Sequence, residues 1–143
     1  MSQRENAIGA LFAVLGQLSL GTTVKRNAAL PERIANHAMA ILRDGEMGEP
    51  EVSLSPLTYH WQHQVAIELF VADPDASARD ARMDVLLVEL ATLIDMDRTL
   101  GGQVEYTEIG PPKFDELAPD GTSGIKACLL PVVLHYSSAG PLS

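Results

Sequence analysis

Two histidines three residues apart, His60 and His63, are the first side chains whose types and spacing suggest chemistry. On a helix this spacing would bring two imidazoles to one face, where they could bind a metal ion. The surrounding residues alternate between polar and apolar as a strand does, and a strand sends positions three apart to opposite faces. No neighbouring cysteine or carboxylate completes a ligand set. The pattern therefore favours a structural or interface role for both histidines.

Other reactive side chains also lack the partners that catalysis needs. Cys128 is the only cysteine and lies among apolar residues, which excludes an intrachain disulfide and is typical of an inert core thiol. Neither a Gly-x-Ser-x-Gly elbow nor a glycine-rich phosphate loop is present. Asp95 and Asp97 lack further oxygen ligands, which favours a solvated turn over a calcium site. The sequence predicts no catalytic residue, no metal and no cofactor.

Composition and charge narrow the class of protein. The chain has 143 residues, of which 46% are apolar and 20% charged, enough for one domain, 1–143, with its own core. Its formal net charge of −9 disfavours binding to phosphates but is compatible with DNA passing nearby without sticking. The N-terminal apolar stretch is interrupted by glycines and polar residues, unlike a signal peptide or a membrane span. We therefore expect a soluble protein that is not exported.

Hydrophobic periodicity predicts the elements that must position these residues. We expect helices over 3–18 and from the Asp73-Pro74 cap to about 95, where apolar residues recur at helical spacing. Strands are expected over 22–27, 38–43, 57–72, 103–109 and 125–137, with loops at about 44–52 and 110–124. Pro131 inside the last strand argues for an edge position or a bulge. The predicted fold class is α+β: a mainly antiparallel or mixed sheet of about five strands packed against two principal helices.

Several short segments, in order along the chain, carry a family resemblance. They are residues 23–27 (TVKRN), 43–45 (RDG), Tyr59 with Trp61 in the long strand, 97–102 (DRTLGG), and His135-Tyr136 near the end. Together they resemble the tail-terminator proteins of long-tailed phages and gene transfer agents, the lambda tail-terminator group among them. The resemblance covers nearly the whole chain.

The resemblance implies a structural virion protein that works through surfaces and closed symmetry. Members form a homohexameric ring that caps the tail tube, ends tail polymerisation and offers a surface to head-completion (neck) proteins. The implied partners are further copies of the chain, the major tail-tube protein and the neck protein. DNA passes through without sequence-specific binding, and neither a cofactor nor a membrane is involved. The implied location is the cytoplasm of the bacterial host during assembly, then the tail or neck of the particle.

The residues expected at interfaces come from exposed aromatic, basic and loop positions. The long strand around Tyr59 and the proline-bearing last strand are candidates for pairing between subunits, and the 110–124 loop is expected to order on docking. The candidate interface residues are Lys25, Arg26, Arg43, Tyr59, Trp61, His63, Lys113, Phe114 and Tyr136. The basic members of this set are expected either to pair with acids across a subunit boundary or to be solvated.

Three other readings stay open. A head-completion or neck subunit shares the size and the α+β character of a terminator. A small enzyme would use Cys128 or the histidines. An accessory or regulatory domain is the third, although no nucleic-acid-binding motif is visible.

Overall fold

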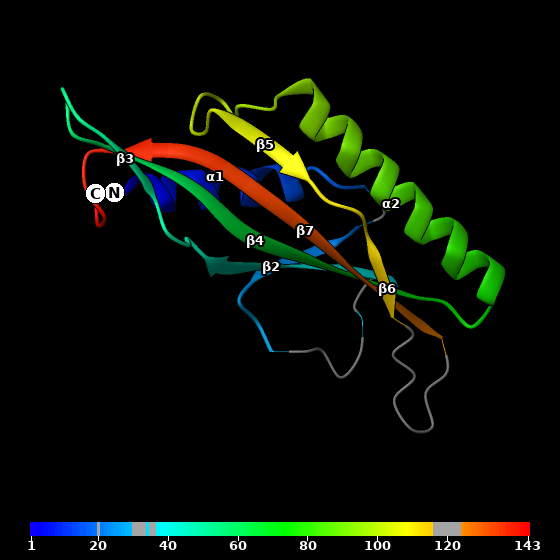
Figure 1. Ribbon diagram of the computed structural model, residues 1–143. Helices are drawn as coiled ribbons and strands as arrows, with labels where there is room; N and C mark the ends of the chain where they lie inside the picture. The colour runs from blue at the N-terminus through cyan, green and yellow to red at the C-terminus, as the bar shows by residue number, and fades with distance from the viewer. Residues whose placement is uncertain (20, 30–33, 35–36, 116–123) are drawn as a thin grey trace.

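The computed structural model describes residues 1–19, 21–29, 34, 37–115 and 124–143, and its two helices and seven strands confirm the α+β class. The helices are α1 (Gln3–Leu15) and α2 (Ala76–Met96) (Figure 1). The strands are β1 (Thr23–Arg26), β2 (Ala38–Glu46), β3 (Glu51–Ser53), β4 (Thr58–Ala72), β5 (Tyr106–Ile109), β6 (Lys113–Asp115) and β7 (Ile125–Ser138).

A long antiparallel ribbon of β4 and β7 forms the centre of the sheet. Its register runs without a break from Tyr59 opposite Ser138 to Ala72 opposite Ile125. Both β2 and β3 pair with one side of β4, while β5 and β6 pair with the far side of β7. The parallel strand β1 lies on β2 and forms an edge. Seven strands therefore occupy five positions across the sheet, which explains why about five were predicted.

Glycine-containing segments interrupt the two flanking strands. Gly45 forms the irregularity at the end of β2, with φ +61°, and a Cβ there would lie 1.8 Å from the carbonyl oxygen of Gln64. Only glycine fits a position that combines this φ with such close backbone approach. The predicted 44–52 loop thus contains the end of β2 and most of β3, joined by 47–50. The predicted 110–124 loop contains β6, and its residues 116–123 lie outside the described part of the chain.

Pro131 was predicted to mark an edge position or a bulge. The edge alternative was wrong, because β7 is paired on both sides, but the register of β7 against β5 and β6 shifts by one residue between Val132 and Leu129. The proline lies at the break between β5 and β6, so no residue of these two strands is opposite it, while Ala66 of β4 is opposite it on the other side. Its carbonyl oxygen accepts a hydrogen bond of 2.8 Å from the backbone N–H of Gly110. A residue without an N–H is tolerated in a central strand because the ladder is already interrupted there.

One face of the sheet packs against both helices and holds the main core. Alternate residues of β2, β4 and β7 point to this face, as the period-two pattern predicted. The helices meet them with fully buried side chains, among them Ile8, Leu11 and Leu15 of α1 and Leu86, Leu90 and Ile94 of α2. Figure 1 shows α1 behind the β4–β7 ribbon and α2 running along the side of the sheet near β5 and β6. Neither described helix is both long and apolar enough to cross a membrane.

Capping residues fix where the helices begin. The Ser2 hydroxyl accepts a hydrogen bond from the Glu5 backbone N–H at the start of α1. At the start of α2 the cap is Asp75, which accepts from the backbone N–H of Ala78 at 3.2 Å. The predicted cap, Asp73, instead accepts from the N–H of Asp75 and shapes the turn before the helix. Each carboxylate thus accepts from a backbone N–H that has no partner within the helix, Asp73 just before the helix and Asp75 in its first turn.

The opposite face of the sheet, called the open face below, has no helix on it among the described residues. A small apolar cluster of Met39, Ile41, Phe70 and Ala127 lies toward one end, with Ala28 and Ile34 packed against it. Elsewhere the open face presents half-buried or exposed side chains of β4 and β7. The described residues therefore leave much of this sheet face uncovered.

Candidate interaction surfaces

Three of the expected interface residues, Trp61, His63 and Tyr136, are buried inside the subunit. The Trp61 indole N–H donates to the hydroxyl of Ser138 at 2.9 Å, and its ring stacks on Tyr59 with centroids 6.2 Å apart. These contacts hold the ends of β4 and β7 together. Trp61 and Tyr136 thus shape the end of the ribbon and present little surface of their own.

His63 is 1% exposed and is held at both ring nitrogens. Its Nδ1 lies 2.7 Å from the Tyr136 hydroxyl, and its Nε2 lies 2.6 Å from the backbone carbonyl oxygen of Asp44. Because a carbonyl only accepts, Nε2 carries the proton, and the Tyr136 hydroxyl donates to Nδ1. Burial lowers the pKa of His63 and raises the pKa of Tyr136 to about 12, so both side chains are neutral near pH 7.

Arg26 and Arg43 form ion pairs within the subunit. The Arg26 guanidinium bridges Glu5 of α1 and Asp44 of β2, with nitrogen–oxygen distances of 2.7 Å to each. Its hydrogen bonds lower the pKa of both carboxyls, and the two carboxylates raise the pKa of Arg26 in turn. Arg43 pairs with Glu68 at 3.0 Å across β2 and β4 on the open face. Arg26 and Arg43 therefore pair with acids of their own chain, whereas the sequence analysis considered acids across a subunit boundary.

The remaining expected residues, Lys25, Lys113 and Phe114, are exposed. Lys25 lies on the edge strand β1, and Lys113 and Phe114 on the short edge strand β6. The Phe114 side chain is 54% exposed, and the Lys126 ammonium lies 4.9 Å from its ring centroid. An exposed aromatic beside a free sheet edge is suited to contact with a partner.

Two apolar surfaces were missed by sequence reasoning. The β3–β4 hairpin carries Val52, Leu54 and Leu57 at its tip, with Leu54 77% exposed. Figure 1 shows this hairpin at one end of the molecule, near both chain termini. The second surface is the outer side of α2, where Val85, Val88 and Met96 are exposed. Each such side chain forgoes roughly 1.5–3 kcal/mol that full burial would provide.

Signals for both surfaces were present in the sequence. The chain has no aspartate, glutamate, lysine or arginine from residue 52 to residue 67, although 20% of all residues are charged. In α2, valines at 85 and 88 lie off the stripe formed by Leu86, Leu90 and Ile94. A helix that is apolar on two sides is usually covered on both. These patterns indicated uncovered apolar surface, which binary patterning alone does not reveal.

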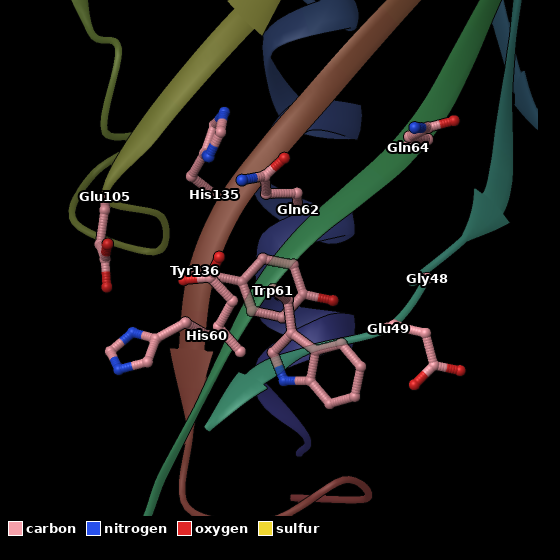
Figure 2. Close-up of a pocket in the computed structure, with 10 residues that line it drawn as sticks. Gly48, Glu49, His60, Trp61, Gln62, Gln64, Glu105, His135 and Tyr136 are labelled. Carbon is pink, nitrogen blue, oxygen red and sulfur yellow. The ribbon is translucent and has the colours of Figure 1, made fainter. Parts of the chain in front are cut away.

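A polar hollow of about 350 Å³ opens on the open face near the hairpin. Figure 2 shows Glu49 and Glu105 on opposite sides of it, with Gln62 between them. Its two histidines have partners within the chain, since His60 lies 2.9 Å from the Ser53 hydroxyl and His135 lies 3.0 Å from a Glu108 carboxylate oxygen, beside the hollow. The hollow offers acids and amides for binding, and no nucleophile paired with a base.

An apolar hollow of about 470 Å³ lies farther along the open face. It is lined by Gly45, Glu46, Gln64, Val65, Ala66, Pro131, Val132 and Val133. Ala66 and Pro131 are opposite each other in the ladder, and Gly45 has no side chain. The hollow exists because small residues meet at the point where β2 is irregular.

Catalytic and metal chemistry find little support in the described residues. No three of their histidine, cysteine, aspartate and glutamate side chains gather closely enough to hold a metal ion. Cys128 is buried against the core, and burial raises the pKa of its thiol, which disfavours the reactive thiolate. The geometry that stands out is that of binding surfaces.

The sequence matches no family model and no curated protein. Among solved structures, it is similar to the sheath/tube terminator of an extracellular contractile injection system, PVC, seen in its extended state by cryo-electron microscopy. The two share 13% sequence identity with a TM-score of 0.41, over 91% of this chain and 54% of the other. The chain thus spans about half the length of that protein.

Proposed function

We propose that this chain is a tail-terminator subunit, which assembles into a homohexameric ring on the end of a tail tube and stops its growth. The observation that carries the proposal is that this acidic α+β subunit leaves several separate apolar surfaces uncovered: the hairpin tip, the outer side of α2 and the hollow of the open face. Apolar patches of this kind mark protein–protein contacts more often than ligand sites.

The segments that carry the family resemblance have structural roles in this fold, which supports reading them together. Asp44 and Gly45 form the irregular end of β2 that defines the apolar hollow. In the 97–102 segment, the Asp97 carboxylate accepts from the backbone N–H of Gly101 at 2.8 Å and closes the turn after α2. Tyr59, Trp61 and Tyr136 lie at the ribbon end. A set of motifs that builds one framework is more informative than the same motifs as isolated short strings.

A ring requires each subunit to contact its neighbours through two different surfaces, whereas a two-fold dimer needs only one. Surfaces that remain after ring closure are then free for the tube below and the neck protein above. We assign the exposed residues Lys25, Lys113 and Phe114 to these contacts, together with the outer side of α2. The tube protein, the neck protein and further copies of the chain are the proposed partners.

The proposed ring lets DNA pass without holding it. The net charge of −9 and the exposed Glu49, Glu51 and Glu105 beside the polar hollow repel a phosphate backbone. No cofactor is required for such work, because it is performed by complementary surfaces. We propose that the subunit is made in the bacterial cytoplasm and ends in the tail or neck of the particle.

The experiment adds the purified protein to growing tail tubes of the particle that encodes it and images the products by negative stain. The proposal predicts ring-shaped caps at one tube end and tubes that stop lengthening once capped. A variant that carries Val88→Asp tests the tube contact, because it places a charge on the outer side of α2, which is assigned to that contact. Binding to the portal side of heads and not to tubes would instead support the neck subunit. A protein that stays monomeric, both alone and with tube ends, would refute the proposal.

A further inference from the structure

The tip of the β3–β4 hairpin is an apolar surface that the described residues leave uncovered. Val52, Leu54 and Leu57 are exposed, and Figure 1 shows the tip at the far end of the ribbon. The apolar hollow is lined on β4 by residues 64–66, six to eight residues beyond the first residue of the strand, which places it roughly 20–27 Å away at the rise of an extended strand. Because β4 is paired along its length, the hairpin cannot fold back onto this hollow. The described residues of the subunit therefore leave the tip open to a second molecule.

We infer that the tip of this hairpin docks into the apolar hollow of a second copy of the chain, and that this contact joins neighbouring subunits of the proposed ring. The inference rests on the proposed function and names the surfaces through which it acts. The two surfaces are different, so the contact is head-to-tail, and repeating it gives a closed ring or an open filament.

Electrostatics favour this pair of surfaces over the other exposed apolar one. Two copies, each with a net charge of −9, repel each other, and the repulsion is smallest where uncharged surfaces meet. The tip belongs to the segment 52–67, which has no charged side chain at neutral pH, and Glu46 is the one acid that lines the apolar hollow. The outer side of α2 carries Asp84 among its valines, so a contact between two such sides would bring acids together.

Size and chemistry also match. A cavity of ~150 Å³ lined by apolar groups accepts a molecule as large as benzene. The hollow, at about 470 Å³, has room for Leu54 and a neighbouring tip side chain. The Ala66 and Pro131 side chains offer an apolar floor, while Gln64 at the rim can bond to the hydroxyls of Ser53 and Ser55 beside the leucine. An apolar centre with a polar rim is the usual arrangement of a specific interface.

The test is disulfide cross-linking of the full-length chain that carries both Leu54→Cys and Ala66→Cys. Under mild oxidation by copper phenanthroline, head-to-tail docking brings the two thiols of neighbouring copies together and produces a ladder up to a closed covalent ring on a non-reducing gel. The single variant Leu54→Cys can form only dimers. A matched control, Val88→Cys with Ala66→Cys, gives no ladder. Cys128 stays in place because it is buried.

A second variant distinguishes loss of the intersubunit contact from loss of folding. Leu54→Asp changes a side chain that is already 77% exposed, so its melting temperature should equal that of the wild type. Its assembled fraction should fall at least tenfold, whereas Ala13→Asp, at an exposed position on α1 that is assigned to no contact, should assemble like the wild type. Wild-type rings without the cross-linked ladder, or rings formed by Leu54→Asp at full yield, overturn the docking contact and leave the proposed function standing. A wild type that never assembles overturns both.

Discussion

Replacing the buried His63 tests whether its hydrogen-bond network stabilises the ribbon. In His63→Phe, the Tyr136 hydroxyl and the Asp44 carbonyl oxygen both lose their partner. Leaving a buried polar group unpaired costs about 1–3 kcal/mol, so the variant should be about 2–4 kcal/mol less stable at pH 7.5. Urea denaturation followed by tryptophan fluorescence measures this difference, because the Trp61 side chain is buried two residues away.

The same variant should show a distinctive dependence on pH. Burial lowers the pKa of His63 from its usual 6.5, so the folded state keeps it neutral while the unfolded state binds a proton. Lowering the pH below 6.5 therefore favours unfolding, by up to about 1.4 kcal/mol for each unit until the folded pKa is reached. The phenylalanine variant lacks this loss. The gap in unfolding free energy should narrow by up to about 1.4 kcal/mol between pH 7.5 and pH 5.5.

The control is His60→Gln, which changes an exposed histidine three residues away on the same strand. This variant keeps His63 and should retain the acid-dependent loss, with a stability within about 0.5 kcal/mol of the wild type. A gap between wild type and His63→Phe that stays constant from pH 7.5 to 5.5 would refute the reasoning, because it would mean that the folded state takes up the proton as readily as the unfolded chain.

Three further predictions concern the framework and the thiol. Gly45→Ala should destabilise the fold by about 3 kcal/mol or more, seen in a thermal melt, because its Cβ would overlap a backbone oxygen of β4 and its φ is positive. Arg26→Ala should cost about 1 kcal/mol at pH 7, a modest value because the pairs are partly solvated. Arg26 lowers the pKa of Glu5 and Asp44, so this stability is present above about pH 4.5 and is lost as the pH falls through the lowered pKa values. The difference in unfolding free energy between variant and wild type should therefore shrink steadily as the pH is lowered below about 4.5. Cys128 should react with a thiol reagent only after denaturant is added, and labelling of the native protein at the same rate would contradict its burial.

The long elements of the fold were predictable because their periodicity is strong. Alternation over 57–72 gave β4 almost to the residue, and the apolar stripe between the Asp73-Pro74 cap and about residue 95 gave α2. The two three-residue strands, β3 and β6, were not predicted because so short a strand has no period and forms only by pairing with the ribbon beside it. The edge alternative for Pro131 was wrong because tolerance of this proline depends on a break between two other strands, which local sequence does not encode.

The candidate surfaces were less predictable than the fold, because exposure depends on what other elements cover. Trp61 and Tyr136 were expected at an interface, yet both side chains are buried in the main core of the subunit. The alternating pattern did indicate the position of His63. It is the one polar residue among the inward-facing positions of its strand, and a histidine at such a position is expected to be buried and hydrogen-bonded. The uncovered leucine of the hairpin, Leu54, looked like an ordinary turn residue between serines.

The central claim is that the chain works by assembling into a ring that caps a tail tube. The most direct measurement is the mass of the assembled species, by light scattering after size-exclusion chromatography, on the protein alone and after release from capped tubes. A homohexamer has a mass of about 92 kDa, six times the 15.4 kDa of one subunit. That mass, with six-fold rings in negative stain, is the predicted result. A single species of 15.4 kDa under both conditions, with tube ends left bare, would contradict the claim.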